Sequence, residues 1–382
     1  MSLFVEFHLI QNFAPSNLNR DDTGAPKEAV FGGYRRARVS SQCFKRAIRL
    51  AAQGLPGLPV ENQGVRTKKL RQLLRDELTT RGRSPEDADK RIETALSAAG
   101  LQLKEDGKTQ YLLFLGQQEI AGFADLVDRH WDMLQPTAGN GEKKSKKDAK
   151  AAVPPEVQKQ AKAIMNGGKA VDVALFGRML ADLPEVNQDA ACQVAHALST
   201  HKVERDFDYF TAVDDKGDAD ESGAGMIGQV EFNSATFYRY AVIDPHKLTA
   251  NLQDDRELAL RGIEAFVEAI ARAIPTGKQN TFAAHNPPSF IGVVVRHGSA
   301  LNLANAFESP VFAKHGESLT GQSVARLADY ESKLAGVYGD SQDRWAYIDL
   351  TEAWPASKGE AQRNLAALAD WVVTQVDGAL GR

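Results

Sequence analysis

The chain has 382 residues, of which 43% are apolar and 25% charged, typical of a folded water-soluble protein with room for two or three sub-domains. No apolar run reaches the roughly 18 residues that a membrane span requires, so no membrane partner is expected. The only two cysteines, Cys43 and Cys192, argue against a disulfide framework and favour a reducing cytoplasm.

The net charge of −4 argues against a nucleic-acid partner only if the charges are evenly spread, and they are not. Between Lys27 and Arg49 there are seven basic residues and one acid, Glu28, whereas eight acids lie between Glu204 and Glu221. At physiological salt, charges more than about 8 Å apart are largely screened from one another. The basic segment, residues 27–49, therefore predicts a surface that binds a polyanion.

The first elements of the chain place this basic segment between a strand and a helix. Residues 3–10 predict a strand, and the following stretch carries flexible glycines. Ser40 and Ser41 offer an N-cap for a helix that runs to about Ala52. Apolar residues form one stripe along this helix. Three polar residues follow the flank of the stripe: Gln42, Lys45 and Arg49.

The rest of the chain predicts an α+β protein with a large helical insertion. Residues 66–134 read as mainly helical, with an interruption around residues 100–116. A lysine-rich stretch at 136–155 is expected to be a disordered loop. The remaining expectations are helices at 156–165, 186–200, 255–273, 319–335 and 360–378, strands at 230–243 and 290–296, and an acidic excursion at 202–229.

The chemistry of the basic segment suits phosphate groups. Paired glycines let backbone N–H groups approach a phosphate, and arginines supply charge and forked donors. The hydroxyls of Ser40 and Ser41, with the N–H groups at the helix start, would add an anion site. Such contacts give affinity without reading sequence. On composition alone, a solvated basic loop beside an amphipathic helix explains these residues as well as a binding site does.

Motifs for catalysis or metal binding fail when their spacing is checked. Gln279 stands where a phosphate loop needs Ser or Thr, and Gln229 where a calcium loop needs Glu. Cys192 and His196 share a predicted helical face, with His201 five residues further on, but no fourth zinc ligand is apparent. The common hydrolase and zinc-protease motifs do not occur. We therefore expect no enzyme activity, no cofactor and no metal.

Two further segments admit a binding role. Tyr209 and Phe210 lie among acids, outside any helical stripe, and could anchor a loop or stack against bases. Met179 ends the apolar stretch 171–179, where core filling is the default expectation.

Taken in order, these segments resemble the backbone family of type I-E CRISPR Cascade complexes, often called CasC. The resemblance touches most of the chain but is loose in residues 55–165 and in the C-terminal tail. The motifs that carry it are SNLNRDD (16–22), FGGYRRARVSSQ (31–42), KRAIR (45–49), VDVALFGRM (171–179), VAHALSTHKVERDFDYFTAVDD (194–215), FYRYA (237–241) and PTGKQNTFAAHNPP (275–288).

The resemblance implies an RRM-like (ferredoxin-like) palm with a large helical fingers insertion and a thumb excursion. The palm would comprise residues 1–54 and 230–382, with residues 166–200 partly returning to it. The fingers would be residues 55–165, and the thumb residues 201–229.

The resemblance also implies a non-catalytic subunit that polymerises head to tail along a CRISPR guide RNA. With other Cascade subunits it would present the guide in segments to target DNA in antiviral defence. The residues expected to contact RNA are Arg20, Lys27, Arg35, Arg36, Arg38, Ser40, Gln42, Lys45, Arg46, Arg49, Met179, Phe210 and Thr211. Those expected to contact DNA are Lys143, Lys144, Lys146 and Lys147, although a solubilising loop is an equal alternative there.

Two other functions remain open at this point. One is a metal-dependent ribonuclease that cuts target RNA with a thumb aspartate, for which the candidates are Asp206, Asp208, Asp214 and Asp215. The other is a purely structural protein whose basic face binds an acidic protein.

Overall fold

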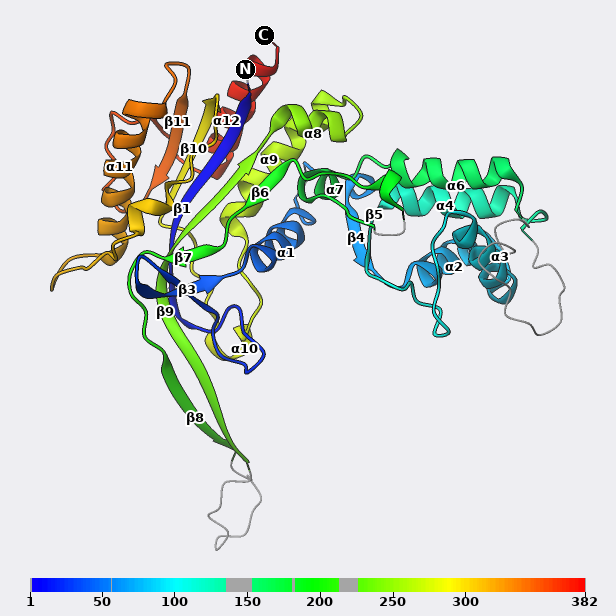
Figure 1. The fold of residues 1–382 in the computed structure, drawn as a ribbon, viewed down its shortest axis with the longest axis horizontal. Coiled ribbons are helices and arrows are strands. Elements are labelled where there is room, and N and C mark those ends of the chain that lie inside the picture. The colour runs from blue at the N-terminus through cyan, green and yellow to red at the C-terminus, as the bar shows by residue number, and fades with distance from the viewer. Residues whose placement is uncertain (1, 56, 135–152, 181–182, 213–225, 382) are drawn as a thin grey trace, which may run out of the picture. The chain divides into compact units, whose positions relative to one another are not determined.

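The computed structural model describes residues 2–55, 57–134, 153–180, 183–212 and 226–381 (Figure 1). The chain divides into two units. The sheet unit comprises residues 1–55, 192–246 and 260–382, and the helical unit residues 56–191 and 247–259. In the described part of the chain, no helix is long and apolar enough to cross a membrane.

The sheet unit is built on one ten-stranded sheet with the order β12-β11-β10-β1-β9-β7-β3-β2, in which β6 and β8 also pair with β9. The long strand β1 lies antiparallel between β9 and β10 (Figure 1). The strands are β1 Leu3–Ser16, β2 Glu28–Phe31, β3 Tyr34–Val39, β6 Cys192–Val194, β7 Ala197–Ser199, β8 Asp206–Ala212, β9 Met226–Ile243, β10 Phe290–His297, β11 Arg344–Asp349 and β12 Glu360–Ala361.

Helices cover both faces of this sheet because the side chains of β1 alternate between two apolar layers. On one face Phe7 packs against Phe266 of α9, with ring centroids 5.0 Å apart. On the other face Ile10 joins a core cluster that includes Leu327 of α11. In Figure 1, α9 and α12 lie on the side of the sheet opposite α11. The helices of the sheet unit are α1 Ser41–Ala52, α10 Gln279–Phe282, α11 Leu319–Tyr338 and α12 Leu365–Leu380, with the 3-10 turn η3 Leu303–Phe307. Helix α9 Arg256–Arg272 belongs to this unit from residue 260 onwards, and most of α8 Pro245–Asn251 belongs to the helical unit.

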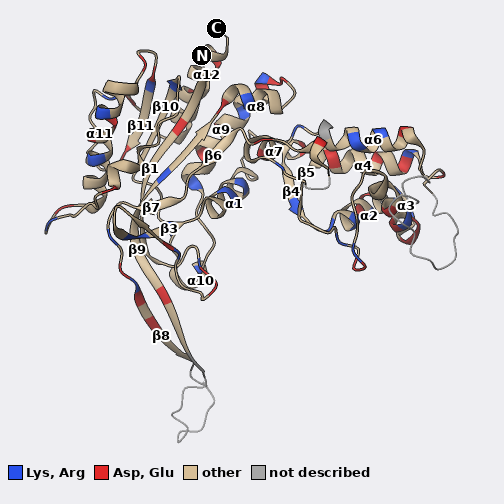
Figure 2. Ribbon diagram, viewed as in Figure 1, with Lys and Arg blue, Asp and Glu red and all other residues tan. Residues whose placement is uncertain are grey.

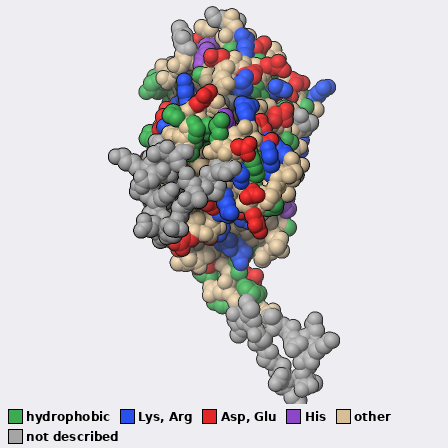
Figure 3. All heavy atoms as spheres, turned by 90° about the vertical axis from the view of Figure 1, so that its right-hand side faces the viewer, with side chains coloured by type: hydrophobic (Ala, Val, Ile, Leu, Met, Phe, Trp, Pro, Cys, Tyr) green, Lys and Arg blue, Asp and Glu red, His purple; other side chains and the backbone are tan. Residues whose placement is uncertain are grey.

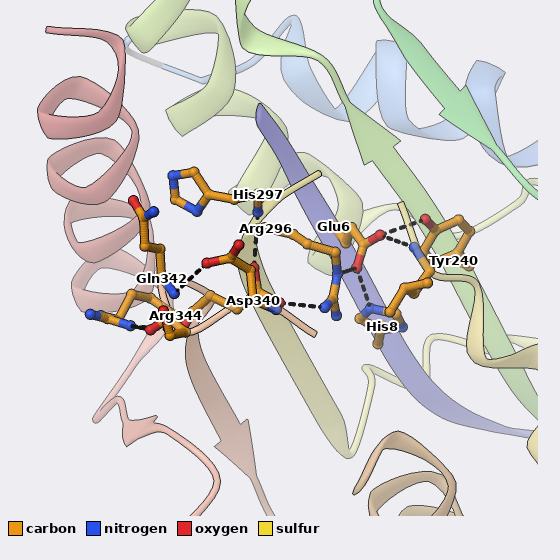
Figure 4. A network of polar contacts seen from close by, with 11 residues as sticks. Glu6, His8, Tyr240, Arg296, His297, Asp340, Gln342 and Arg344 are labelled. Atoms are coloured by element: carbon orange, nitrogen blue, oxygen red, sulfur yellow. Dashed lines mark hydrogen bonds and ion pairs between the residues drawn. The ribbon is translucent and has the colours of Figure 1, made fainter. Parts of the chain in front are cut away.

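A buried polar network holds the middle of the sheet together (Figure 4). The Glu6 carboxylate accepts hydrogen bonds from Arg296 Nε (2.8 Å) and from the Tyr240 hydroxyl (3.1 Å). Arg296 also pairs with Asp343 (2.7 Å), while His8 Nε2 lies 3.5 Å from Glu6. Burial raises the pKa of Glu6, but the hydrogen bond from His8 and the charge of Arg296 offset it and leave the pKa below its ordinary value.

The helical unit has its own apolar core, to which residues such as Leu74, Ile92 and Phe123 contribute. The helices expected within residues 66–134 and at 156–165 are confirmed. Its surface carries acidic and basic side chains next to one another (Figure 3). Its elements are η1 Val60–Asn62, β4 Gly64–Thr67, α2 Leu70–Thr80, α3 Pro85–Ala98, β5 Leu113–Gly116, α4 Gln117–Arg129, α6 Pro155–Gly167, α7 Val171–Phe176 and η2 Pro184–Val186.

The expected helix at residues 186–200 is wrong. This segment contains β6 and β7, which pair with β9 in the register Cys192↔Ile243 and Leu198↔Tyr238. Pairing with a long strand distant in sequence decides the conformation of so short a segment, whatever its local preference. Cys192 and His196 therefore do not share a helical face. The final helix also begins later than expected, at Leu365, with Asn364 as its N-cap.

Candidate nucleic-acid interface

Helix α1 lies where the sequence predicts it and is fixed to the sheet by its apolar side. Ser40 caps it, and Phe44, Ala47 and Ile48 are buried. The buried guanidinium of Arg239 lies 4.1 Å from the centre of the Phe44 ring and donates to Gln11 Oε1 (2.6 Å). Burial lowers the pKa of Arg239 to about 9. This support could not be predicted from the sequence, because nothing in a strand pattern marks an arginine as buried.

Helix α1 carries several basic residues along its length (Figure 2). These side chains occur three or four residues apart, so they lie on neighbouring turns of one helix face. Gln42 and Arg46 are exposed, and Lys45 and Arg49 are half-buried. We use the term basic strip for these four residues: Gln42, Lys45, Arg46 and Arg49.

A loop at residues 17–27 is held against the start of this helix. Asn19 Oδ1 accepts a hydrogen bond from the Ser40 amide (2.9 Å), and the Asn19 carbonyl accepts one from the Lys27 amide (2.8 Å). These contacts bring Lys27 and Arg46 close to the Cys43 thiol. Burial raises the pKa of that thiol, and the two cations only partly offset the rise. Three expected RNA contacts thus lie in the same region: Arg20, Lys27 and Arg46.

A pocket of about 500 Å³ opens between this loop, α1 and the loop that precedes α10. Gly277 closes one wall, since a Cβ there would lie 2.3 Å from the Leu18 carbonyl oxygen. The pocket contains both cations and carboxylates. Its lining residues are Leu18, Asn19, Arg20, Asp21, Asp22, Gly24, Cys43, Arg46, Ala47, Pro275, Thr276 and Gly277.

Arg36 does not belong to the exposed set, contrary to expectation. It is 0% exposed, and its guanidinium donates to the carbonyl oxygens of Ser199 (3.0 Å) and Phe307 (2.7 Å). It thereby joins β3, β7 and η3 inside the sheet unit. A nucleic acid has no access to it, so we remove Arg36 from the predicted contacts.

Arg35 and Arg38 lie on the hairpin of β2 and β3 with their own partners. Arg35 is exposed but pairs with Glu28 (2.6 Å), which also binds Arg205 (2.6 Å). Arg38 donates through Nε to the Glu28 carbonyl (3.2 Å). Burial raises the pKa of Glu28, but Arg205 and Arg35 outweigh it and hold the pKa below its ordinary value. Of these two, only Arg35 presents an exposed cation.

The expected anion sites of the basic segment are partly occupied by the protein itself. Gly32 and Gly33 form the turn between β2 and β3, with φ of 59° and 81°, which glycine adopts without strain. At the helix start, Ser40 Oγ accepts from the Cys43 amide, and His196 Nδ1 accepts from the Ser41 amide (3.1 Å). Two of the backbone amides at the helix start are therefore already hydrogen-bonded within the protein.

The ribbon of β8 and β9 carries the aromatic residues singled out in the sequence. Phe210 is 42% exposed and lies over Gly228, its partner in the ladder. Because side chains alternate along a strand, Tyr209, which is 71% exposed, and Thr211 lie on the opposite face.

Met179 lies in the helical unit and is 84% exposed, so it does not fill the core. Its neighbours hold its backbone firmly. Arg178 is buried in an ion pair with Glu119 (2.8 Å), and Leu180 is buried with its amide bonded to Asn187 Oδ1 (2.5 Å). The chain thus fixes an apolar side chain in solvent, which favours a contact outside the subunit.

Several expectations fall outside the described residues. These are the lysines at 143, 144, 146 and 147, the loop around them, and Asp214 and Asp215 beyond the ribbon. Asp206 and Asp208 are described and lie exposed on β8. Among the described residues, no three His, Cys, Asp or Glu side chains are grouped so that they could hold a metal ion.

Comparisons with known proteins identify a family and similar solved structures. A family described as "CT1975-like protein" matches residues 5–371. A chain of a "CRISPR RNA-guided surveillance complex, pre-nicking" is 31% identical with a TM-score of 0.86, and the match covers 97% of this chain and 99% of that one. A chain of a "CRISPR RNA-guided surveillance complex" is 27% identical with a TM-score of 0.75 at the same coverage. No curated protein sequence matches.

Proposed function

Because the chain belongs to the family of CT1975-like proteins, we propose that it is a CRISPR RNA-binding backbone subunit of a Cascade surveillance complex. We assign it to type I-E and to the cytoplasm. The observation that carries the proposal is the basic strip on α1, flanked by Arg20 and Lys27. The likeness to chains of RNA-guided surveillance complexes supports it.

In this proposal the protein binds the sugar-phosphate backbone and leaves the sequence to base pairing. Lys45, Arg46 and Arg49 neutralise phosphates, and Gln42 adds an uncharged donor. Holding the guide backbone in a fixed path orders its bases before target DNA arrives, so less entropy is lost when each segment pairs. Further copies stack head to tail on the RNA and bind other Cascade subunits.

The sheet unit serves as the RRM-like palm in this proposal, the helical unit as the fingers, and the ribbon of β8 and β9 as part of the thumb. Phe210 and Thr211 from the ribbon, and Met179 from the helical unit, press on the guide at regular intervals. The lysines at 143–147 contact duplex or displaced DNA. These assignments rest on the resemblance and on the exposure of Met179 and Phe210.

The test is to purify the full chain from cells that carry a CRISPR array and to sequence the nucleic acid that co-purifies. We expect RNA of uniform length that contains the array's repeat. Replacement of Lys45 and Arg49 by Ala should weaken RNA binding and reduce the salt slope by about 0.7 per lost phosphate contact. Replacement of the exposed Lys314 and Lys333 by Ala is the matched control and should change neither quantity. Absence of RNA would overturn the proposal.

We also propose that the subunit is not catalytic. The guide-loaded assembly, incubated with complementary RNA and magnesium, should leave that RNA intact. Cleavage at regular intervals would instead establish the ribonuclease alternative, with Asp206 and Asp208 as the first residues to replace. An assembly that survives complete removal of RNA would favour an acidic protein as the partner of the basic strip.

A further inference from the structure

The pocket beside α1 holds unpaired charges of both signs. Arg20, Asp22 and Arg46 line it, and within the described residues none of these three side chains forms a hydrogen bond or an ion pair. All three side chains are exposed, so their charged groups are accessible to a ligand. The pocket therefore offers two cationic donor groups and one acceptor group to whatever enters it.

Asp21, the other carboxylate of the pocket, has a structural role. Its Oδ1 accepts hydrogen bonds from the amides of Thr23 (2.9 Å) and Ala25 (3.1 Å), and from the Thr23 hydroxyl (2.7 Å). These bonds shape the loop at residues 17–27. Within the described residues the Asp22 side chain forms no such hydrogen bond, so its carboxylate can accept one from a ligand.

A carboxylate beside a phosphate-binding cation is unfavourable for a ligand that carries only negative charge, because like charges repel. It becomes favourable when the same ligand offers a hydrogen-bond donor. RNA does so at each nucleotide, since the ribose 2′-hydroxyl lies close to the phosphates, and DNA lacks this group. A volume of about 500 Å³ lies within the range that holds a small organic group.

We propose that this pocket receives one ribose-phosphate unit of RNA, with Asp22 accepting a hydrogen bond from the 2′-hydroxyl while Arg20 and Arg46 bind the phosphates. Asp22 is then the residue by which the subunit distinguishes RNA from DNA. This inference rests on the proposed function and adds to it the side chain that makes the subunit prefer RNA to DNA.

The experiment compares the affinities of the full chain for an RNA and a DNA oligonucleotide of the same sequence and length, at one fixed salt concentration. The unsubstituted protein should prefer RNA. Asp22→Ala should reduce the RNA-to-DNA preference about five- to tenfold, with DNA binding unchanged or tighter because a negative charge is lost. Arg46→Ala should weaken binding to both polymers and leave their ratio unchanged, since both contain phosphate. Asp370→Ala, an exposed acid on α12 outside the pocket, controls for net charge and should leave the ratio unchanged.

Asp22→Asn separates hydrogen-bond acceptance from charge, because its amide keeps an acceptor oxygen. It should retain most of the preference for RNA. A preference that survives Asp22→Ala, or that Asp22→Asn loses to the same extent, would overturn the inference. If the unsubstituted protein binds RNA and DNA equally, the inference fails and the proposed function stands. If it binds neither, the proposed function itself fails.

Discussion

His8 is a neutral histidine enclosed among charged groups. It lies on β1 with Glu6 beside it, Arg296 on β10, Tyr238 and Tyr240 on β9, and Glu331 of α11 at longer range. Burial lowers its pKa below the ordinary 6.5, and the neighbouring Glu6 only partly offsets this. The folded protein therefore leaves His8 unprotonated at a pH where the unfolded chain takes up a proton.

This difference predicts a loss of stability on mild acidification. Since the folded-state pKa is the lower one, His8 contributes stability that is complete above pH 6.5 and is lost as the pH falls from there towards the folded-state pKa. The slope for one such group is about 1.4 kcal/mol per pH unit. Urea unfolding of His8→Gln between pH 7.5 and 5.5 should show a shallower pH dependence than the unsubstituted protein, whatever its absolute stability. His315→Gln, in an exposed loop, should keep the original slope. An unchanged slope in His8→Gln would contradict this account.

At the scale of elements, α1 could be predicted closely, whereas the segment after α7 could not. Helix α1 has a cap, a 3.6-residue stripe and a basic flank, all of which are local signals. Strands β6 and β7 have three residues each and owe their conformation to pairing with β9, which begins 32 residues after β6 ends. Arg36 shows the same limit within the basic segment, because the carbonyl groups that bury it come from Ser199 and Phe307.

The N-cap of α1 allows its structural and binding roles to be separated. Ser40→Ala removes the hydrogen bond that Ser40 Oγ accepts from the Cys43 amide and should lower the free energy of unfolding by about 1 kcal/mol. Ser40→Asp keeps a good cap and should preserve stability, but it places a negative charge beside the basic strip and should weaken RNA binding.

The matched control is Ser318→Asp at the cap of α11, where Ser318 Oγ accepts from the Gly321 amide (3.2 Å). It introduces the same charge at a helix start outside the proposed interface, and RNA affinity should not change. Urea unfolding and RNA titration at one salt concentration measure both effects. Undiminished RNA binding by Ser40→Asp would place the start of α1 away from any phosphate.

At the scale of the whole molecule, the proposed contacts with RNA come from both units. The basic strip and Phe210 belong to the sheet unit, and Met179 to the helical unit. The sequence alone offered stacking against bases for Phe210 only as an alternative to anchoring a loop. It could identify Met179 only through a resemblance, because an apolar residue in a mixed segment reads as core by default. Their exposure is a property of the folded chain. Arg178 and Leu180 hold the backbone on either side of Met179, and Gly228 provides the surface on which the Phe210 ring lies.

If both side chains press on the guide, then bases should be displaced from the stack at a constant interval along bound RNA. Chemical probing of base accessibility in the purified assembly should show a periodic signal, since unstacked bases react more readily than stacked ones. Phe210→Ala, and separately Met179→Ala, should weaken this periodicity while the RNA remains bound, because phosphate contacts supply most of the affinity. Phe312→Ala is the control: Phe312 is 69% exposed in the segment before α11, outside the ribbon, and its loss should leave the periodic pattern intact. A uniform pattern in the unsubstituted assembly would show that the two side chains contact something other than the guide.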